Sequence, residues 1–156
     1  MKSLKFLHKM ILLAIVTIAF SACNKNETNR DYNINGDWKV SAFVNYETSE
    51  VITKTEDNTW SQFNNGDITV SFIRNSSVGG TISGRRVTNS FSGDYSIGQW
   101  GTIKISNIIQ TMINEPEWGI LFDSIEEAET FEVKNGQLVI YYNQGKNAIT
   151  FDRMTE

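Results

Sequence analysis

The sequence predicts a mainly β domain, folded as an antiparallel barrel or a strongly curved sheet, with one amphipathic helix before a final meander of three strands. Apolar residues alternate with polar ones along much of the chain, for example at Ile68, Val70 and Phe72, and a period of two is typical of strands with one buried face. Turn-forming residues recur at short intervals, as they do in sandwiches and barrels.

A first strand is predicted around Trp38, because Trp38, Val40, Ala42 and Val44 alternate with polar or smaller residues. Further strands are predicted at residues 68–72 and 103–105. Glycine and asparagine favour turns, and they break the strands at four places: Asn35-Gly36, Asn64 to Asp67, Gly79-Gly80 and Ser92-Gly93.

The last part of the chain predicts a meander. Phe131 and Val133 lead into Asn135-Gly136, a pair suited to a type I′ turn with positive φ at both central residues. A return strand follows at residues 137–142, a second break at residues 143–146, and a final strand at residues 148–153.

A helix is predicted before this meander. Trp118, Leu121, Phe122 and Ile125 fall at i, i+3, i+4 and i+7, which places them on one helical face. We expect Asn114 to cap the first turn together with Glu117, and Pro116 to lie within that turn without needing an amide partner. The apolar stripe is expected to pack against the sheet.

The N-terminus has the order of a secretory signal peptide: three lysines (Lys2, Lys5 and Lys9), an apolar run from Met10 to Phe20, then small residues. This run is too short to cross a bilayer, which takes about 20 helical residues. The stretch Phe20-Ser21-Ala22-Cys23 resembles a bacterial lipobox, which implies that Cys23 is acylated, for example with palmitate, and becomes the first residue of the mature chain.

This reading divides the chain into a signal peptide (1–22), a lipidated tether (23–34) and a β domain (35–156). Stable anchoring by acyl chains places such a domain on a membrane surface. We therefore expect a partner membrane and a location in the cell envelope, at the outer membrane, on its periplasmic or its surface face.

Charge and composition exclude several functions. Removing residues 1–22 lowers the lysine and arginine count from 14 by three to 11, against 18 Asp and Glu, so the formal charge is −7. Nucleic acid is not an expected partner, since it requires a basic surface. The one histidine, His8, lies in the signal peptide, which removes triad chemistry and most zinc sites. We expect no enzyme activity, metal or cofactor.

Acidic residues cluster before the meander, at Asp123, Glu126, Glu127 and Glu129. A charge run of this kind is typical of a solvated helix end. These acids also allow the hypothesis of a carboxylate-dependent hydrolase that uses pairs among Asp94, Asp123 and Glu126, which ranks below a non-catalytic role.

Scattered motifs across the β domain resemble the META domain family, which includes the heat-inducible HslJ-type envelope proteins. The motifs are Gly79 to Gly84, Asn89 to Tyr95, Gly101 to Ile105, Thr111-Met112, Glu117, Phe131 to Val133, Gln137 to Ile140 and Ile149 to Arg153. Thr88 and Asn114 stand where the family often has cysteines. The resemblance implies a compact antiparallel β fold with a crossing helix, an envelope or secreted setting and no established catalytic residues.

A second resemblance is to lipocalins, and it begins at Asn35-Gly36-Asp37-Trp38, which is similar to the Gly-x-Trp of that family. Arg153, near the end of the last strand, is placed to stack on Trp38. The lipocalin resemblance implies a barrel that holds a small apolar ligand. Packing that closes the barrel is the alternative role for Trp38 and Arg153.

The function predicted from these features is a lipid-anchored, non-catalytic envelope module with a structural, stress-related or binding role. The alternative is a lipocalin-like carrier of a small hydrophobic ligand. Trp60 and Trp100, in polar loops, and Tyr95 are candidate binding residues for an envelope protein or such a ligand. The expected structural signature comprises Gly36, Trp38, Asn89, Gly93, Tyr95, Thr111, Glu117 and Arg153.

Overall fold

The computed structural model describes residues 33–155. Cys23 and the predicted signal peptide lie outside this range, as does most of the predicted tether. The elements in chain order are β1 (Gly36–Asn45), β2 (Glu50–Ile52), η1 (Asn64–Gly66), β3 (Thr69–Ser76), β4 (Gly79–Arg85), β5 (Ser90–Ile97), η2 (Gln99–Gly101), β6 (Ile103–Gln110), α2 (Glu117–Leu121), η3 (Phe122–Glu127), β7 (Thr130–Lys134), β8 (Gln137–Tyr142) and β9 (Asn147–Arg153).

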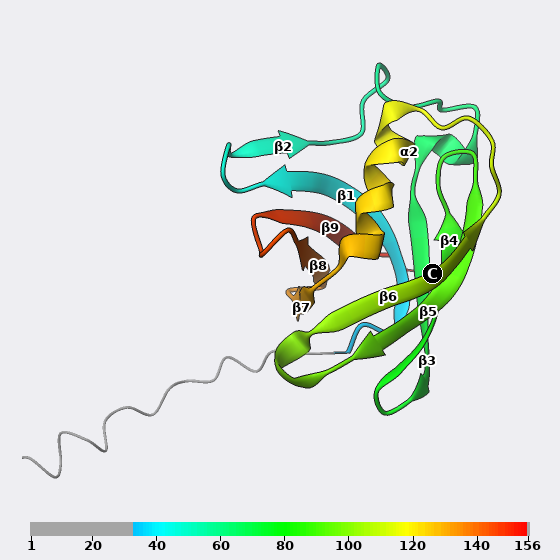
Figure 1. Cartoon of the computed structure of the whole chain (residues 1–156). Helices are drawn as coiled ribbons and strands as arrows, with labels where there is room; N and C mark the ends of the chain where they lie inside the picture. The colour runs from blue at the N-terminus through cyan, green and yellow to red at the C-terminus, as the bar shows by residue number, and fades with distance from the viewer. Residues whose placement is uncertain (1–32, 156) are drawn as a thin grey trace, which may run out of the picture.

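The strands form one antiparallel sheet in the order β6-β5-β4-β3-β1-β9-β8-β7, and β2 pairs with the end of β1. Because β1 pairs with both β3 and β9, the order is that of an up-and-down barrel interrupted between β6 and β7. The sheet curls into a half-barrel (Figure 1). The predicted fold class, including the helix before the last three strands, is confirmed.

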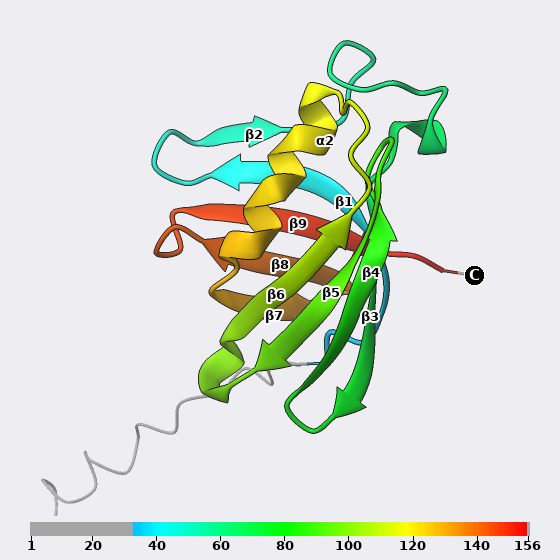
Figure 2. The same cartoon turned by 45° about the vertical axis from the view of Figure 1, so that its right-hand side comes forward.

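The two edge strands meet at one point only. Thr102 and Thr130 form an isolated antiparallel bridge, and the amide of Ile103 donates to the carbonyl of Glu129 at 2.9 Å. Beyond this bridge the strands diverge, and α2 and η3 cross the opening (Figure 2). The seam between β6 and β7 is therefore closed by a helix instead of a hydrogen-bond ladder.

The core lies between the concave face of the sheet and this helix. The predicted helical stripe is buried, with Trp118, Phe122 and Ile125 each 3% exposed or less and Leu121 partly buried. The ring of Trp118 meets Phe43 edge to face, with centroids 5.0 Å apart. Removing such large side chains from water is the main stabilising contribution to a domain of this kind.

The predicted turns before and after β8 are confirmed. Asn135 and Gly136 have φ of 54° and 80°, as a type I′ turn requires, and the register pairs Lys134 with Gln137. The break after β8 likewise places Asn143 at positive φ. The meander of β7, β8 and β9 follows.

Three local predictions are wrong. The break expected at Ser92-Gly93 lies inside β5, where Ser92 pairs with Ser83 on one side and Ile109 on the other. The pairing of β1 with β9 shifts between Val40 and Ala42, and this bulge turns Phe43 into the core while Val44 is only partly buried. The helix is not capped by Asn114 and Glu117. Its N-cap position is Pro116, without a side-chain hydrogen bond, because Asn114 and Glu115 are engaged with the β4–β5 turn instead.

Candidate functional site

A cleft opens on the surface where β6 ends and the chain turns back into α2. Its volume is about 270 Å³. The cleft is formed by the β4–β5 turn, the end of β6, the segment 111–115 and the exposed side of the helix, and its lining residues are Arg86, Asn89, Gln110, Thr111, Met112, Ile113, Asn114, Glu115, Ile120 and Asp123.

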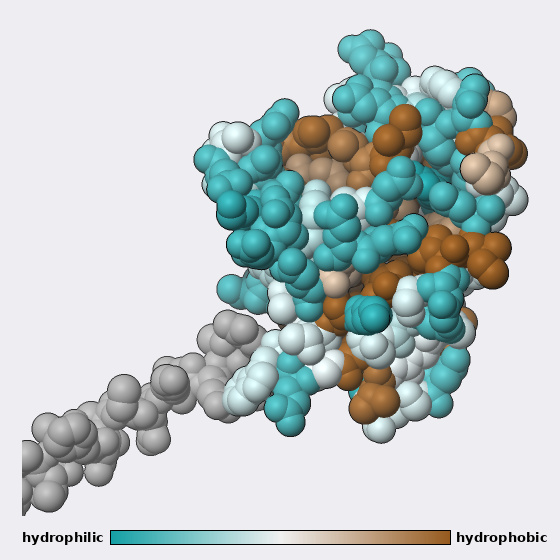
Figure 3. Space-filling view, viewed as in Figure 1, coloured by the Kyte–Doolittle hydropathy of each residue, from teal (hydrophilic) through white to brown (hydrophobic). Residues whose placement is uncertain are grey.

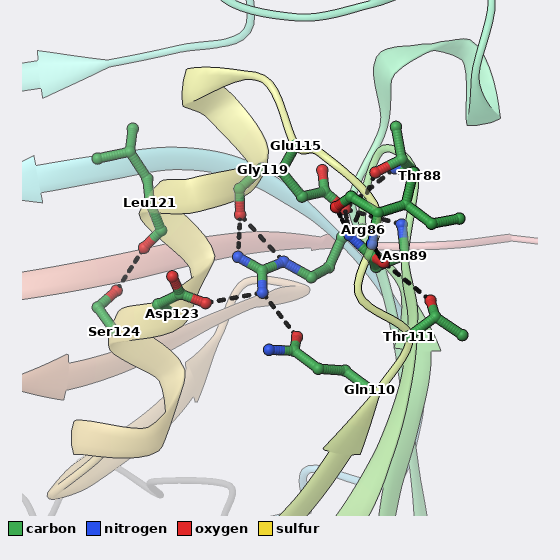
Figure 4. A network of polar contacts seen from close by, with 11 residues as sticks. Arg86, Thr88, Asn89, Gln110, Thr111, Glu115, Gly119, Leu121, Asp123 and Ser124 are labelled. Atoms are coloured by element: carbon green, nitrogen blue, oxygen red, sulfur yellow. Dashed lines mark hydrogen bonds and ion pairs between the residues drawn. The ribbon is translucent and has the colours of Figure 1, made fainter.

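Arg86 forms one part of the cleft floor and is 5% exposed. Its Nε and Nη2 donate to the carbonyl of Gly119 in α2 at 3.1 and 2.5 Å. Its Nη1 donates to Gln110 Oε1 at 2.7 Å and pairs with Asp123 Oδ1 at 2.7 Å. One buried guanidinium thus joins the β4–β5 turn, the end of β6 and the helix (Figure 4).

Asn89 and Glu115 form the other part of the floor (Figure 4). Glu115 Oε1 accepts from the amides of Thr88 and Asn89 at 3.1 and 2.7 Å and from Asn89 Nδ2 at 2.9 Å. Asn89 is 3% exposed, and its Oδ1 accepts from the hydroxyl of Thr111 and the amide of Ile113. These contacts hold the 111–115 segment in place although it has no regular secondary structure.

The cleft walls expose apolar side chains. Met112, Ile113 and Ile120 are 95%, 61% and 54% exposed, and all three line the cleft. Ile109, one residue before the lining begins, is 75% exposed. In the space-filling view a brown apolar area lies over the end of β6 (Figure 3).

Acidic residues flank this apolar wall. Residues three apart share a face in the first helical turns and in a 3₁₀ helix, so Glu117, Ile120, Asp123 and Glu126 form a row along α2 and η3. Asp123 pairs with Arg86. Among the described residues, Glu117 and Glu126 have no ion pair or side-chain hydrogen bond. The wall is therefore apolar with a net negative charge.

The structure does not bring the candidate binding residues together. Trp60 is 38% exposed and lies against Phe63, with ring centroids 6.3 Å apart, in the loop that leads to the start of β3. Trp100 is 83% exposed and lies in the β5–β6 turn, at the other end of these strands. Tyr95 is 3% exposed and packs edge to face on Phe72; burial raises the pKa of its hydroxyl.

The signature residues of the first strand do meet. The guanidinium of Arg153 lies 4.3 Å from the centroid of the Trp38 ring, as predicted, and the two residues are paired across β1 and β9. Gly36 has a φ of 127°, and a Cβ there would lie 2.7 Å from Arg153 Nη1. Glycine at this position therefore leaves room for the arginine.

The remaining signature residues have different settings. Asn89 and Thr111 join in the cleft floor at 2.9 Å. Gly93 lies opposite a bulge in β6, where a Cβ would meet Ile108 at 2.7 Å. Glu117 is exposed on the first turn of α2. Thr88, at a position where the META family often has cysteine, donates its hydroxyl to the carbonyl of Asn114, the other such position, at 2.8 Å.

A second surface hollow has a volume of about 260 Å³, and Met154 is the one exposed large apolar side chain in its lining of Asp37, Thr69, Val70, Ser71, Gly84, Met154 and Thr155. The space between η3 and β6 has a volume of about 10 Å³, which holds about one water molecule. Within residues 33–155, no three histidine, cysteine, aspartate or glutamate side chains gather so as to hold a metal ion. The helices of this part are all too short or too polar to cross a bilayer.

Sequence reasoning missed Arg86 and Glu115, which organise the cleft. The signal was weak, because Arg86 follows a second arginine, Arg85, and Glu115 precedes the proline at the helix start. Both look like surface residues until the chain folds back. The apolar Val87 between Arg86 and Thr88 is a hint that this short stretch is buried.

Comparison with known proteins identifies the fold. No protein-family model matches the sequence, and no curated protein matches it. Among solved structures, the chain is similar to a DUF4847 family protein from Bacteroides vulgatus ATCC 8482, with a TM-score of 0.55 and 13% sequence identity over 78% of this chain and 94% of that chain. At this level of identity the similarity establishes the fold alone.

Proposed function

We propose that the protein is a non-catalytic binding module of the cell envelope, carried on a lipid anchor at Cys23, and that its partner occupies the cleft between β6 and α2. The observation that carries the proposal is the exposed apolar wall of Met112, Ile113 and Ile120 beside a cavity of about 270 Å³. Contiguous apolar surface with a polar border is typical of interaction sites. The fixed polar floor below it presents this wall in one conformation.

The charge around the cleft favours a basic partner. Residues 111–133 contain seven acids and no lysine, arginine or histidine, the acids being Glu115, Glu117, Asp123, Glu126, Glu127, Glu129 and Glu132. Complementary charge guides association and excludes wrong partners. We infer a protein segment whose apolar side chains cover the cleft wall and whose lysines or arginines lie near Glu117 and Glu126.

The contacts of the carboxylates favour binding over hydrolysis. Asp123 is paired with Arg86, and Asp94 accepts a hydrogen bond from Asn107 at 2.8 Å. Both groups are therefore engaged in local contacts. Asp94 lies on β5, while Asp123 and Glu126 lie on η3.

A lipocalin-like carrier is the second candidate. The interrupted barrel order, together with Gly36, Trp38 and Arg153, favours it. The filled interior argues against it, because large side chains such as Trp38, Phe72, Trp118 and Phe122 occupy the concave side at 1% exposure or less. A carrier needs a lined pocket of roughly 300 Å³ or more.

The test is site-specific photo-crosslinking in the bacterial envelope with the full-length protein. A photoreactive side chain at Met112 is expected to attach to one discrete protein. Ile73, on β3, is 53% exposed and serves as the control position. The double substitution Glu117→Lys and Glu126→Lys is expected to weaken binding of the partner about tenfold, equivalent to roughly 1.4 kcal/mol of binding free energy. The yield of the crosslinked product from position 112 should fall accordingly.

A matched variant separates the cleft from overall charge. Asp37→Lys with Glu50→Lys changes the net charge equally, at two exposed acids on β1 and β2, and is expected to leave the yield unchanged. Equal crosslinking from Met112 and Ile73 would contradict the proposal. Native mass spectrometry provides a test of the carrier. A bound apolar molecule that adds to the mass of the protein and is lost after organic extraction would favour the carrier instead.

A further inference from the structure

The two turns at the opposite end of β3–β6 from the cleft carry no charge. They are residues 76–79, between β3 and β4, and residues 98–102, between β5 and β6, and they consist of serine, glycine, threonine, glutamine, Val78 and Trp100. The amide of Ile97 donates to the carbonyl of Val78 at 2.7 Å, so the two turns are adjoining. Val78 is 61% exposed and Trp100 83% exposed, which is unusual for tryptophan.

Trp100 is also held in an unfavourable backbone conformation. Its φ is 62° and its ψ 24°, the left-handed region that costs a residue with a side chain about 1–2 kcal/mol. Gly101 follows at a φ of 76°, and Gly98 donates to the carbonyl of Thr102 at 2.9 Å. This tight turn normally favours asparagine before glycine. Neither stability nor packing explains a tryptophan here.

The described chain begins at this same end of the molecule. The side-chain oxygen of Asn35 accepts from the amide of Arg74, near the end of β3, at 2.9 Å. In both views the start of β1 lies beside the two turns (Figures 1 and 2). Asn33 lies ten positions after Cys23, and at about 3.5 Å per position the chain between them reaches at most about 35 Å. A lipid on Cys23 would keep these turns close to the bilayer.

We propose that the turns 76–79 and 98–102 rest on the lipid surface that holds the anchor, with Trp100 inserted among the headgroups. Tryptophan favours the membrane interface, where its ring is partly in apolar surroundings and its N–H remains hydrated. Arg74, two residues before the first turn, and Lys104, two residues after the second, are placed to meet lipid phosphates. The inference rests on the proposed anchor at Cys23, and it points the cleft away from the membrane.

The test uses the full-length acylated protein in phosphatidylcholine vesicles whose acyl chains carry bromine, which quenches nearby tryptophan emission. Trp38 and Trp118 are buried at 0% and 1% exposure, so Trp60 and Trp100 report on the surface. Lipid-dependent quenching is expected for the wild-type protein. Trp100→Asn should remove most of it, whereas Trp60→Phe, at the cleft end, should retain it.

The loss of quenching in Trp100→Asn is not expected to result from unfolding. Asparagine tolerates positive φ, so the thermal midpoint of this variant is expected to stay the same or rise. Flotation of the protein with the vesicles in a density gradient tests the anchor separately. If the protein floats but shows no quenching, the proposed contact is wrong and the anchor stands. The same conclusion follows if Trp100→Asn is quenched like the wild type. If the protein does not float with the vesicles, the anchor and the contact both fail.

Discussion

The two ends of the sheet are closed in different ways. On one side, β7, β8, β9 and β1 are joined by antiparallel ladders with a single bulge in β1 and by apolar side chains that point inward. On the other side, β6 pairs with β5 along one edge, its second edge meets β7 only through the bridge between Thr102 and Thr130, and α2 with η3 completes the wall. Buried polar side chains, chiefly Arg86 and Asn89, hold that helix and the segment before it.

The molecule is expected to open locally at the seam between β6 and β7 and not in the meander. A ladder of backbone hydrogen bonds over a packed core breaks only with global unfolding, whereas a wall held by a few side chains can detach locally. The cleft lies on the wall of the second kind. We therefore expect the meander to set the overall stability and the seam to set the conformation of the binding surface.

The largest effect is expected from Phe151→Ala in β9. Phe151 is fully buried, and its removal leaves a cavity on the ladder side, which should lower the free energy of unfolding by about 3–5 kcal/mol. Urea denaturation measures this change. All regions should lose protection from hydrogen exchange together. A loss of protection confined to α2 would show that β9 does not set the overall stability.

The next effect is expected from Arg86→Met, which keeps the side-chain length and removes the charge. The carbonyl of Gly119 loses the two guanidinium donors and keeps the amide of Phe122. Gln110 loses its donor and Asp123 its ion-pair partner, at a total cost of about 2–3 kcal/mol. Hydrogen exchange should accelerate in residues 111–127 before it accelerates in β8. Arg85→Met changes the neighbouring arginine, which is exposed, and should have little effect. Uniform acceleration in both regions would contradict a separable seam.

The meander could be predicted from the sequence, whereas the cleft at the seam could not. The meander is encoded by neighbours in the chain, namely the period of two in β8 and the pair Asn135-Gly136, and it was predicted almost residue by residue. The cleft depends on Arg86 and Glu115 meeting partners more than twenty residues away, and no local pattern encodes such contacts. The expected N-cap at Asn114 was wrong for this reason, since long-range contacts replaced the local one.

A smaller effect is expected from Gly136→Ala in the β7–β8 turn. Nothing lies within 4 Å of a Cβ at this position, so the cost is only that of a φ of 80°, about 1–2 kcal/mol for a residue with a side chain. The thermal midpoint should fall without any change at the seam. Lys134→Ala, an exposed change beside the same turn, serves as control. If exchange in α2 also accelerated, the two sides would be coupled more tightly than we infer.

The smallest effect concerns Tyr141 in β8. Its hydroxyl donates to Glu132 Oε1 at 2.7 Å, and burial, followed by this contact and the charge of Glu132, raises the pKa of Tyr141 well above its usual value of about 10. The neutral hydroxyl is therefore favoured in the folded state, and its contribution to stability is complete below pH 10 and lost as the pH rises further.

Tyr141→Phe should accordingly lower the stability by about 0.5–1 kcal/mol at pH 8 and lessen the further loss above pH 10. Urea midpoints of both proteins between pH 8 and pH 11 measure this difference. Tyr142→Phe provides a matched control at the next residue of β8. The affected contact joins β7 to β8 within the meander, so the rates of hydrogen exchange in α2 and η3 should not change between pH 8 and pH 11. If α2 opened with rising pH in the wild type but not in Tyr141→Phe, the meander would be shown to support the cleft.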